Sequence, residues 1–404
     1  MKLNLLDLPQ TAQENLIGLT RSLNGTSSEK KAFPLQIAYA DKNEFENLTA
    51  DIVTIKKIIE RIPSILGIDQ KKLKDIYGFN GNQSSPLDLQ FIQNASRYFR
   101  PDLILTDQGP KILEFNIDSG CVQFQLYQTL VNLYETNDSF QQFVRDTFRA
   151  DFKSFFQLDQ QFIKSIQAQK KYDHYYFWDV KRDESVSRQI KSAATKLSRL
   201  GINFKFIADI DGLNDLYNKE TTYIHRNFAY IHAIKEKLND DNVLSKSPEL
   251  SPLLPLVLDS KLNMALIFED IIYKTLSAEE KSAVERLIPE TKRCTSAQKS
   301  SKDHVFKKGT SFQGKNTFVS GFTESDFPEN MQYWIQQKKV YPNLPETLFT
   351  NGESLIRASK NHVFNIHFID NQPVSAFFRI NLESDDKVGA VNNITTGLIP
   401  FLRK

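Results

Sequence analysis

Four polar residues in the first third of the chain have the types and spacing of a cation-binding site. Arg100 and Asp102 lie two residues apart in the segment FRPDLIL. Glu114 and Asn116 lie two residues apart in the segment KILEFNI. Both segments have the apolar content of short β-strands, and the Gly-Pro pair at 109–110 is typical of a turn. A hairpin of these two strands would bring the two polar pairs together.

The register of this hairpin decides which side chains face each other. A three-residue loop centred on Gln108, with the following glycine at positive φ, places Asp102 opposite Glu114. Arg100 then lies opposite Asn116, and all four side chains share one face of the sheet. Opposed carboxylates repel each other, so we expect a cation beside them. Carboxylate and amide oxygens suit Mg²⁺, which takes one or two carboxylates and completes its shell with waters and phosphates.

The residues leave a second interpretation of the hairpin open. In that alternative the polar face is exposed to solvent and Arg100 alone neutralises both carboxylates. No metal would then be required. The hairpin residues do not decide between the two interpretations.

A second candidate site lies in the segment HVFKKGTSFQGKN at 304–316. A predicted strand ends in Lys307 and Lys308 and runs into a loop that contains Gly309 and Gly314. Glycines let backbone N–H groups approach a phosphate, and a strand lysine adds a fixed positive charge. Only one of the two lysines can line such a site, because neighbouring strand residues face opposite sides. The segment is no Walker motif, and a lysine-decorated surface turn is the alternative.

Hydrophobic periodicity predicts the elements that would position these residues. Apolar residues recur at three- and four-residue steps over 52–65, which predicts a helix that ends near Gly67. A strand at 174–180, a helix at about 185–199 and a strand at 202–208 form a βαβ pattern. This pattern predicts a small parallel sheet. It contains no GxGxxG, so dinucleotide binding is not indicated.

The remaining elements follow the same patterns. Helical spacing runs from 124 to about 156, and further helices are predicted at about 262–274 and 278–287. Short strands are predicted at 304–308, 334–340, 362–370 and 374–382. We therefore predict an α+β chain of 404 residues in three parts. These parts are a helical segment with the hairpin at 1–165, a βαβ module at 166–250, and a part with the candidate lysine site at 251–404.

Composition and charge exclude several classes of protein. The chain has 51 Lys and Arg against 49 Asp and Glu, a net charge of +2. We therefore expect neither nucleic acid nor a membrane as a partner. Cys121 and Cys294 lack a zinc-binding spacing, and so few cysteines are typical of a reducing compartment. The N-terminus does not read as a signal peptide, and no run approaches the ~18 apolar residues of a membrane span, so we expect a cytoplasmic protein.

The six histidines also lack the spacing of a metal site. His225 lies beside an arginine, and His367 lies inside an apolar strand. Both are expected to be packed or hydrogen-bonded, and we assign no histidine a catalytic role.

A series of segments between residues 95 and 402 resembles, in order, the motifs of the circularly permuted ATP-grasp family. This family includes the ligase half of glutathionylspermidine synthetase. The segments include FRPDLILTDQGPKILEFNIDSG, DSKLNMAL, VFKKGTSFQGKN and WIQQKKV. The matching residues are Arg100, Asp102, Glu114, Asn116, Arg226, Lys261, Pro289, Thr291, Lys307, Gln337, Arg379 and Asn393. The metal motif precedes the nucleotide lysines, which is the reverse of the order in ordinary ATP-grasp proteins.

The resemblance implies a circularly permuted ATP-grasp fold with a small pre-ATP-grasp-like βαβ module. It also implies an ATP-dependent, ADP-forming ligase that joins a carboxylate to an amine through an acyl phosphate. The substrates would be small molecules such as an amino acid, a peptide or a polyamine. Gln313 and Asn316 stand where the family has glycines in its phosphate loop. This departure motivates the alternative of a catalytically silent nucleotide-binding or scaffold protein with the same fold.

The resemblance also assigns roles to individual residues. Mg²⁺ would be bound by Asp102, Glu114 and Asn116. ATP would contact Lys261, Lys307, Gly309, Gly314 and Gln337. The catalytic residues would be Arg100, placed at the γ-phosphate or the acyl phosphate, and Arg379.

Overall fold

The computed structural model describes the greater part of the chain, and every structural statement below concerns the described residues. These are residues 1–26, 32–67, 70–78, 97–117, 124–169, 171–178, 184–207, 218, 220–226, 257–294, 303–309, 317–318, 331–343, 346–358, 362–381 and 396–403. The predicted site residue Gly314 lies outside them, as do Cys121, Gln313, Asn316 and Asn393.

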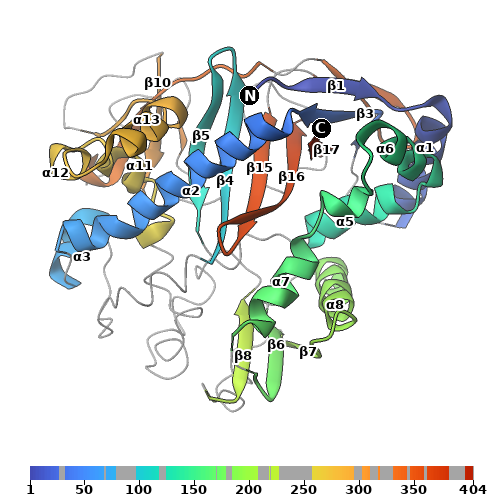
Figure 1. Ribbon diagram of the computed structural model, residues 1–404, viewed down its shortest axis with the longest axis horizontal. Helices are drawn as coiled ribbons and strands as arrows, with labels where there is room; N and C mark the ends of the chain where they lie inside the picture. Colours follow the sequence, from blue (N-terminus) through green and yellow to red (C-terminus); the bar gives the residue numbers. More distant parts are fainter. Residues whose placement is uncertain are drawn as a thin grey trace.

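A seven-stranded sheet forms the centre of the molecule (Figure 1). Its strand order is β1-β3-β17-β16-β15-β4-β5. The bounds, in that order, are Asn4–Asp7, Gln36–Ala40, Thr396–Arg403, Gln372–Asn381, His362–Ile369, Tyr98–Thr106 and Gly109–Asn116. Neighbouring strands are antiparallel except β17 and β3, which are parallel. The sheet therefore joins strands from the predicted segments 1–165 and 251–404.

The long helix α2, Lys42–Ile65, covers one face of this sheet and crosses it in Figure 1. The Asp41 carboxylate caps the helix by accepting the backbone N–H groups of residues 43 and 44. Its buried isoleucines join one core with sheet residues such as Phe99 and Phe364. The predicted helix at 52–65 is confirmed, and it begins ten residues earlier than predicted. It ends before Gly67, which has a φ of +55°.

The opposite face of the sheet packs against a second set of helices. The predicted helical stretch from 124 to about 156 is divided into α5, Phe124–Glu135, α6, Asp138–Phe148, and a short 3₁₀ turn at Phe152–Ser154. The division occurs at Asn137, whose side chain accepts the N–H of Phe140 and starts a new helix. The helix α7, Leu158–Gln167, follows, and α1, Gln10–Thr26, packs beside α5 and α6.

The predicted βαβ pattern is confirmed. The strands β6, His174–Trp178, and β7, Phe204–Ile207, pair in parallel, and α8, Glu184–Ser198, connects them. A third strand, β8, Thr222–Arg226, pairs in parallel with the other side of β6. Aromatic rings attach this module to the large sheet: Tyr98 of β4 lies with its hydroxyl 3.3 Å from that of Tyr223.

A four-stranded sheet of order β11-β10-β12-β9 completes the region beside the hairpin. The bounds are Thr317–Phe318, His304–Lys308, Trp334–Lys338 and Thr291–Arg293. The helix predicted at 262–274 is two short helices, α11, Leu262–Leu266, and α12, Asp270–Tyr273. The next helix, α13, Ala278–Leu287, is present as predicted and begins with a capping box of Ser277 and Glu280.

The remaining described elements are shorter. A three-stranded sheet contains β14, Leu355–Ala358, β13, Thr347–Thr350, and β2, Phe33–Pro34. The helix α3, Gln70–Tyr77, and a 3₁₀ turn at Met331–Tyr333 complete the described elements. Among the described residues, no helix combines the length and apolarity that crossing a membrane requires.

Candidate functional site

The hairpin of β4 and β5 brings the four polar residues together in the predicted register. Asp102 lies opposite Glu114, and Arg100 lies opposite Asn116. The predicted three-residue loop is wrong, because Thr106 pairs with the glycine at 109 and the loop has two residues. That glycine has the predicted positive φ, +97°.

A β-bulge reconciles the shorter loop with the predicted register. Between the pairs Asp102–Glu114 and Leu103–Ile112, strand β5 has one extra residue, Leu113. Without this bulge, the two-residue loop would place Asp102 opposite Leu113 and turn the polar side chains of β5 to the other face. The bulged Leu113 carbonyl accepts a hydrogen bond of 2.9 Å from the Lys307 ammonium.

The Asp102 carboxylate is enclosed by donors from three adjacent strands. Its Oδ1 accepts from Arg100 Nε at 2.7 Å and from Asn365 Nδ2 at 2.7 Å. Its Oδ2 accepts from Arg379 Nη2 at 2.9 Å and from Arg100 Nη2 at 3.3 Å. Arg379 Nε also donates to Asn365 Oδ1. All four side chains are buried, so the structure brings the two predicted catalytic arginines together on one carboxylate.

Asn365, which belongs to this network, and His367, which lies beside it on the same strand, were not predicted as site residues. They lie two positions apart on β15, and the register places Asn365 opposite Asp102. His367 Nδ1 lies 2.9 Å from Ser375 Oγ, as expected for a hydrogen-bonded histidine. Burial, together with Arg100 and Arg379, holds its pKa well below the usual value. The signal in the sequence was the pair of polar side chains at positions 365 and 367, on one face of a mostly apolar strand.

Glu114 is surrounded by cations. Its Oε2 lies 3.1 Å from the Lys261 ammonium. Burial alone would raise the pKa of Glu114, but Lys261, Lys307 and Arg100 outweigh it and lower this pKa to about 2. The carboxylate is therefore ionised near neutral pH. Burial opposes the charge of Lys261 as well, but Glu114 and then Asp259 outweigh it and raise the pKa of that lysine.

Lys307 is held by neutral acceptors as well as by charge. It donates to Gln337 Oε1 at 2.7 Å in addition to the Leu113 carbonyl. Gln337 Nε2 in turn donates to Thr291 Oγ1 at 3.2 Å. Burial lowers the pKa of Lys307 to about 8, although Glu114 acts in the opposite direction. Lys307 is buried and Lys308 is only half-buried, as the predicted strand alternation requires.

Gly309 connects the two lysine-bearing segments through its backbone. Its N–H donates to the Tyr333 carbonyl at 2.8 Å, and its carbonyl accepts the N–H of Lys261 at 2.8 Å. A Cβ atom at Gly309 would lie 2.5 Å from Leu262 Cγ. The glycine therefore permits a close approach between β10 and the start of α11. Its N–H serves the protein backbone rather than a ligand in this structure.

The arrangement concentrates positive charge where water is excluded. Arg100, Arg379, Lys261 and Lys307 are each at most 7% exposed, and they face the carboxylates of Asp102 and Glu114. The four cations outnumber these two carboxylates even when Asp259, which acts on Lys261, is added, and such an excess of positive charge suits a phosphate or an acyl phosphate. Among the described residues, no group of three or more His, Cys, Asp or Glu side chains is placed to bind a metal.

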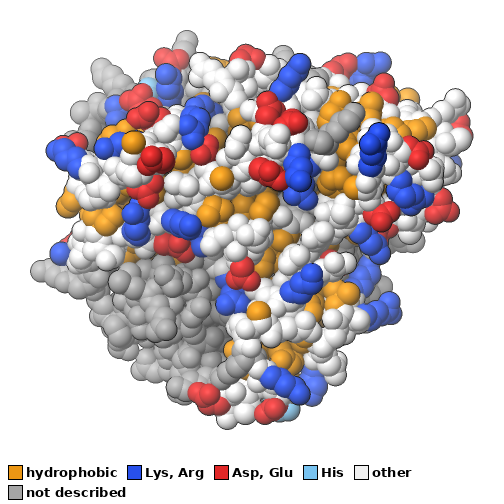
Figure 2. All heavy atoms as spheres, in the orientation of Figure 1, with side chains coloured by type: hydrophobic (Ala, Val, Ile, Leu, Met, Phe, Trp, Pro, Cys, Tyr) orange, Lys and Arg blue, Asp and Glu red, His pale blue; other side chains and the backbone are white. Residues whose placement is uncertain are grey.

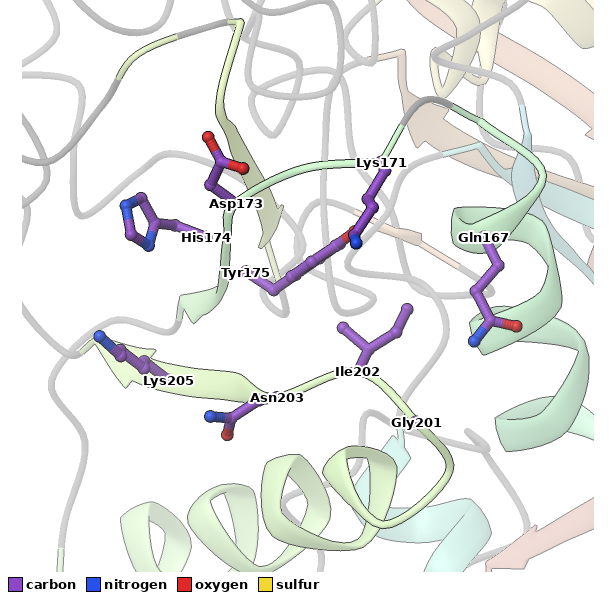
Figure 3. Close-up of a pocket in the computed structure, with 9 residues that line it drawn as sticks. All are labelled: Gln167, Lys171, Asp173, His174, Tyr175, Gly201, Ile202, Asn203 and Lys205. Atoms are coloured by element: carbon purple, nitrogen blue, oxygen red, sulfur yellow. The ribbon is translucent and has the colours of Figure 1, made fainter.

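A surface cavity of about 560 Å³ lies on the small module, apart from the hairpin residues. It is lined by Lys171, His174, Tyr175 and Lys205 among others, and in Figure 3 Lys171 and Tyr175 point toward one another. The described surface in Figure 2 intermixes basic and acidic side chains without a field of one sign. The buried site, and not the visible surface, therefore holds the concentrated charge.

Comparisons with known proteins bear on the fold. No protein-family model matches the chain, and no curated protein matches it. Among solved structures, the chain is similar to a glutathione synthetase-like effector from Globodera pallida, determined in its apo form. The TM-score is 0.56 at 11% sequence identity, and the match covers 99% of this chain and 100% of that chain. The chain thus has a mixed α+β fold like that of the effector.

Proposed function

We propose that this chain is an ATP-dependent, ADP-forming carboxylate–amine ligase with a circularly permuted ATP-grasp fold. The observation that carries the proposal is the set of four buried cations around Asp102 and Glu114. The similarity to a glutathione synthetase-like effector supports a ligase-like fold. The order of the segments supports the permutation, because the hairpin precedes Lys261 and Lys307 in the chain.

The residues of the hairpin fit a magnesium ion in part. Lys261 contacts Glu114 through Oε2, and Asn116 uses its Nδ2 to donate to the Arg100 carbonyl. The second carboxylate oxygen of Glu114 and the amide oxygen of Asn116 are hard ligands on the same face of β5. Mg²⁺ typically takes one or two carboxylates and completes its shell with waters and nucleotide phosphates. Bound there, it would neutralise charge on the β- and γ-phosphates of ATP.

Lysine and arginine side chains of the protein would bind the phosphates and stabilise their negative charge. Lys261 and Lys307 would contact the nucleotide phosphates. The adenine would bind beside Gln337 on β12, the strand next to β10. Arg100 and Arg379 would stabilise the negative charge on the transferred phosphoryl group, because preorganised donors in a dry site cost little reorganisation. The carboxylate of one substrate would attack the γ-phosphorus of ATP and release ADP. The amine would then attack the carbonyl carbon of the acyl phosphate, lose a proton and expel inorganic phosphate to form the amide.

The acid and amine are proposed to be small molecules such as an amino acid, a peptide or a polyamine, handled in the cytoplasm. The βαβ module is proposed to lie on the substrate side. Its cavity offers lysines, a histidine and a tyrosine for the carboxylate-bearing end of such a molecule. Neither nucleic acid nor a membrane is part of the proposal.

A second candidate is a nucleotide-binding protein without turnover. It is favoured by the non-glycine residues Gln313 and Asn316 in the phosphate loop, which lies outside the described residues. In this alternative the cation cluster binds Mg-ATP and no amide forms. The similar protein from Globodera pallida is described as an effector, which is compatible with either function.

An ADP-release screen separates these functions. The purified chain is incubated with Mg-ATP and pairs of amino acids, peptides and polyamines, and ADP and new amides are measured by mass spectrometry. We expect ADP release that requires both an acid and an amine. Mg-ATP binding without ADP release in any pair would support the silent protein, and no binding at all would exclude both.

A further inference from the structure

We infer that Asp102 is a positioning residue for Arg100 and Arg379 and not a magnesium ligand, so that Glu114 and Asn116 form the protein's side of the metal site. The inference rests on the proposed function, because it concerns the metal and phosphate chemistry of the same hairpin. It differs from the sequence prediction, which grouped Asp102 with the two other residues as ligands.

The first step of the inference is a count of acceptor sites. An ionised carboxylate offers about four lone-pair positions, two on each oxygen. In Asp102 all four receive donors: Oδ1 binds Arg100 and Asn365, and Oδ2 binds Arg379 and Arg100. A metal would have to displace at least one of these donors to reach either oxygen.

The second step is the contrast with the residues on β5. The Glu114 side chain is 28% exposed, whereas that of Asp102 is 6% exposed. The only ion pair or hydrogen bond that the described residues give the Glu114 carboxylate is the contact of Oε2 with Lys261. Asn116 is half-buried and donates through its nitrogen, so its oxygen is oriented for a different partner. Glu114 and Asn116 therefore each retain an oxygen that can bind a metal, whereas both oxygens of Asp102 are already occupied by donors.

The third step is what the Asp102 network does for the arginines. Asp102 and Asn365 together provide two acceptors for Arg379, at Nη2 and at Nε. Arg100 is bound side-on through Nε and Nη2. A planar guanidinium held by two acceptors has a fixed orientation. Asp102 and Asn365 therefore hold both cations in place before a phosphate arrives, as electrostatic stabilisation of a transferred phosphoryl group requires.

The test compares Mn²⁺ binding by the wild-type protein and by four variants. Mn²⁺ replaces Mg²⁺ as a spectroscopic probe, and its binding in the presence of ATP is followed by electron paramagnetic resonance. The variants are Glu114→Gln, Asp102→Asn, Asn365→Ala and, as the matched control in the exposed loop of the same hairpin, Asp107→Asn. Circular dichroism and thermal melting confirm that each variant is folded.

The inference predicts that Asp102→Asn behaves like Asn365→Ala and not like Glu114→Gln. We expect Glu114→Gln to weaken Mn²⁺ binding about tenfold or more, as loss of a metal-site carboxylate does. Asp102→Asn and Asn365→Ala should weaken Mn²⁺ binding much less than Glu114→Gln does, because neither change removes a ligand of the metal or a hydrogen-bond partner of one. Both should lower kcat more than they raise KM for Mg-ATP, because they disorder cations that act in the transition state.

Two further outcomes are decisive. If Asp102→Asn loses Mn²⁺ as fully as Glu114→Gln, Asp102 is a ligand and the inference fails while the proposed function stands. If wild-type protein binds no Mn²⁺ with ATP, the proposed function fails and the metal site falls with it. Should Asp102→Asn not fold, wild-type protein labelled with ¹³C-aspartate or ¹³C-glutamate is examined by electron–nuclear double resonance. A directly bound carboxylate is expected only with labelled glutamate, and one with labelled aspartate overturns the inference.

Discussion

The two halves of the candidate site balance charge in different ways. The arginine half, Arg100, Asp102, Asn365 and Arg379, lies entirely on three neighbouring strands of the large sheet. The lysine half, Glu114, Lys261, Lys307 and Gln337, joins the edge strand β5 to a separate sheet and helix. The hydrogen bonds of the arginine half all lie within the large sheet. The lysine half depends on the packing of β5 against the four-stranded sheet and the start of α11.

This difference indicates in which half a bound ligand would alter the charge balance. In the arginine half each carboxylate position already has a donor, so its geometry is set by the sheet alone. In the lysine half Glu114 contacts Lys261 and not Lys307, and burial lowers the pKa of Lys307 toward neutrality. A phosphate would relieve this excess of positive charge. We therefore expect ligands to act mainly on the lysine half, and mutations in the arginine half to act mainly on stability and turnover.

The largest expected effect is that of Asp102→Asn on folding. The substitution leaves two buried guanidiniums without their shared negative charge, and removing one partner of a buried pair costs about 3–5 kcal/mol. Chemical denaturation should show this loss in the free energy of unfolding. Asp107→Asn, in the exposed loop of the same hairpin, should change it by less than about 1 kcal/mol. Equal effects would mean that the network contributes no more than the loop.

The second-largest expected effect is a loss of folding stability in acid, through protonation of Glu114. The pKa of Glu114 is lowered to about 2 in the folded state, so its contribution is present above the unfolded pKa near ~4.3. That contribution is lost as the pH falls from this value toward 2, and it amounts to roughly 2–3 kcal/mol. Glu114→Gln should lower stability at pH 7 by a similar amount and should remove this part of the acid dependence. An unchanged acid profile would show that Glu114 is not held by Lys261 and Lys307.

The junction between the two lysine segments should be sensitive to one methyl group. Gly309→Ala puts a Cβ 2.5 Å from Leu262 Cγ, and such overpacking costs about 1–3 kcal/mol. The matched control is Gly18→Ala in helix α1, where nothing lies within 4 Å of the added carbon. That change should stabilise the protein by about 0.5–1 kcal/mol, because alanine is the better helix residue. Thermal melts that shift in the same direction for both would contradict the close approach.

The smallest effect concerns one proton. Because the pKa of Lys307 is lowered to about 8, the unliganded protein gains stability from this residue as the pH rises from 8 to 10.5. A bound phosphate favours the charged lysine, so binding of ATP at pH 8 should take up as much as about half a proton. Calorimetry in two buffers of different ionisation enthalpy measures this uptake. It should vanish at pH 6, where the lysine is already charged, and in Lys307→Gln.

Local patterns predicted the strand residues of the site, and long-range pairing supplied what they missed. The register expected from the turn placed Asp102 opposite Glu114, and strand alternation separated Lys307 from Lys308. The route to that register was wrong, because the two-residue loop and the extra residue Leu113 compensate for each other. A bulge depends on what the freed carbonyl contacts, here a lysine 194 positions away. No local pattern contains that information.

The partners of Asp102 show the same limit. Asn365 and Arg379 lie on strands more than 260 positions away in the sequence, and they meet Asp102 only because β15 pairs with β4. The spacing of Asn365 and His367 indicates which face of β15 is polar. It does not indicate that β15 pairs with β4. The parallel pairing of β17 with β3 was likewise absent from the predictions.

Thermal melting with Mg-ATP tests the central claim, that this site binds ATP, most directly. A ligand that binds only the folded state at a hundredfold excess over its Kd adds about 2.7 kcal/mol of stability. We expect the wild-type melting temperature to rise with Mg-ATP, the rise to be nearly lost in Lys307→Ala, and the rise to persist in Lys308→Ala, whose side chain lies on the other face of β10. A wild-type melting temperature that millimolar Mg-ATP leaves unchanged would contradict the account.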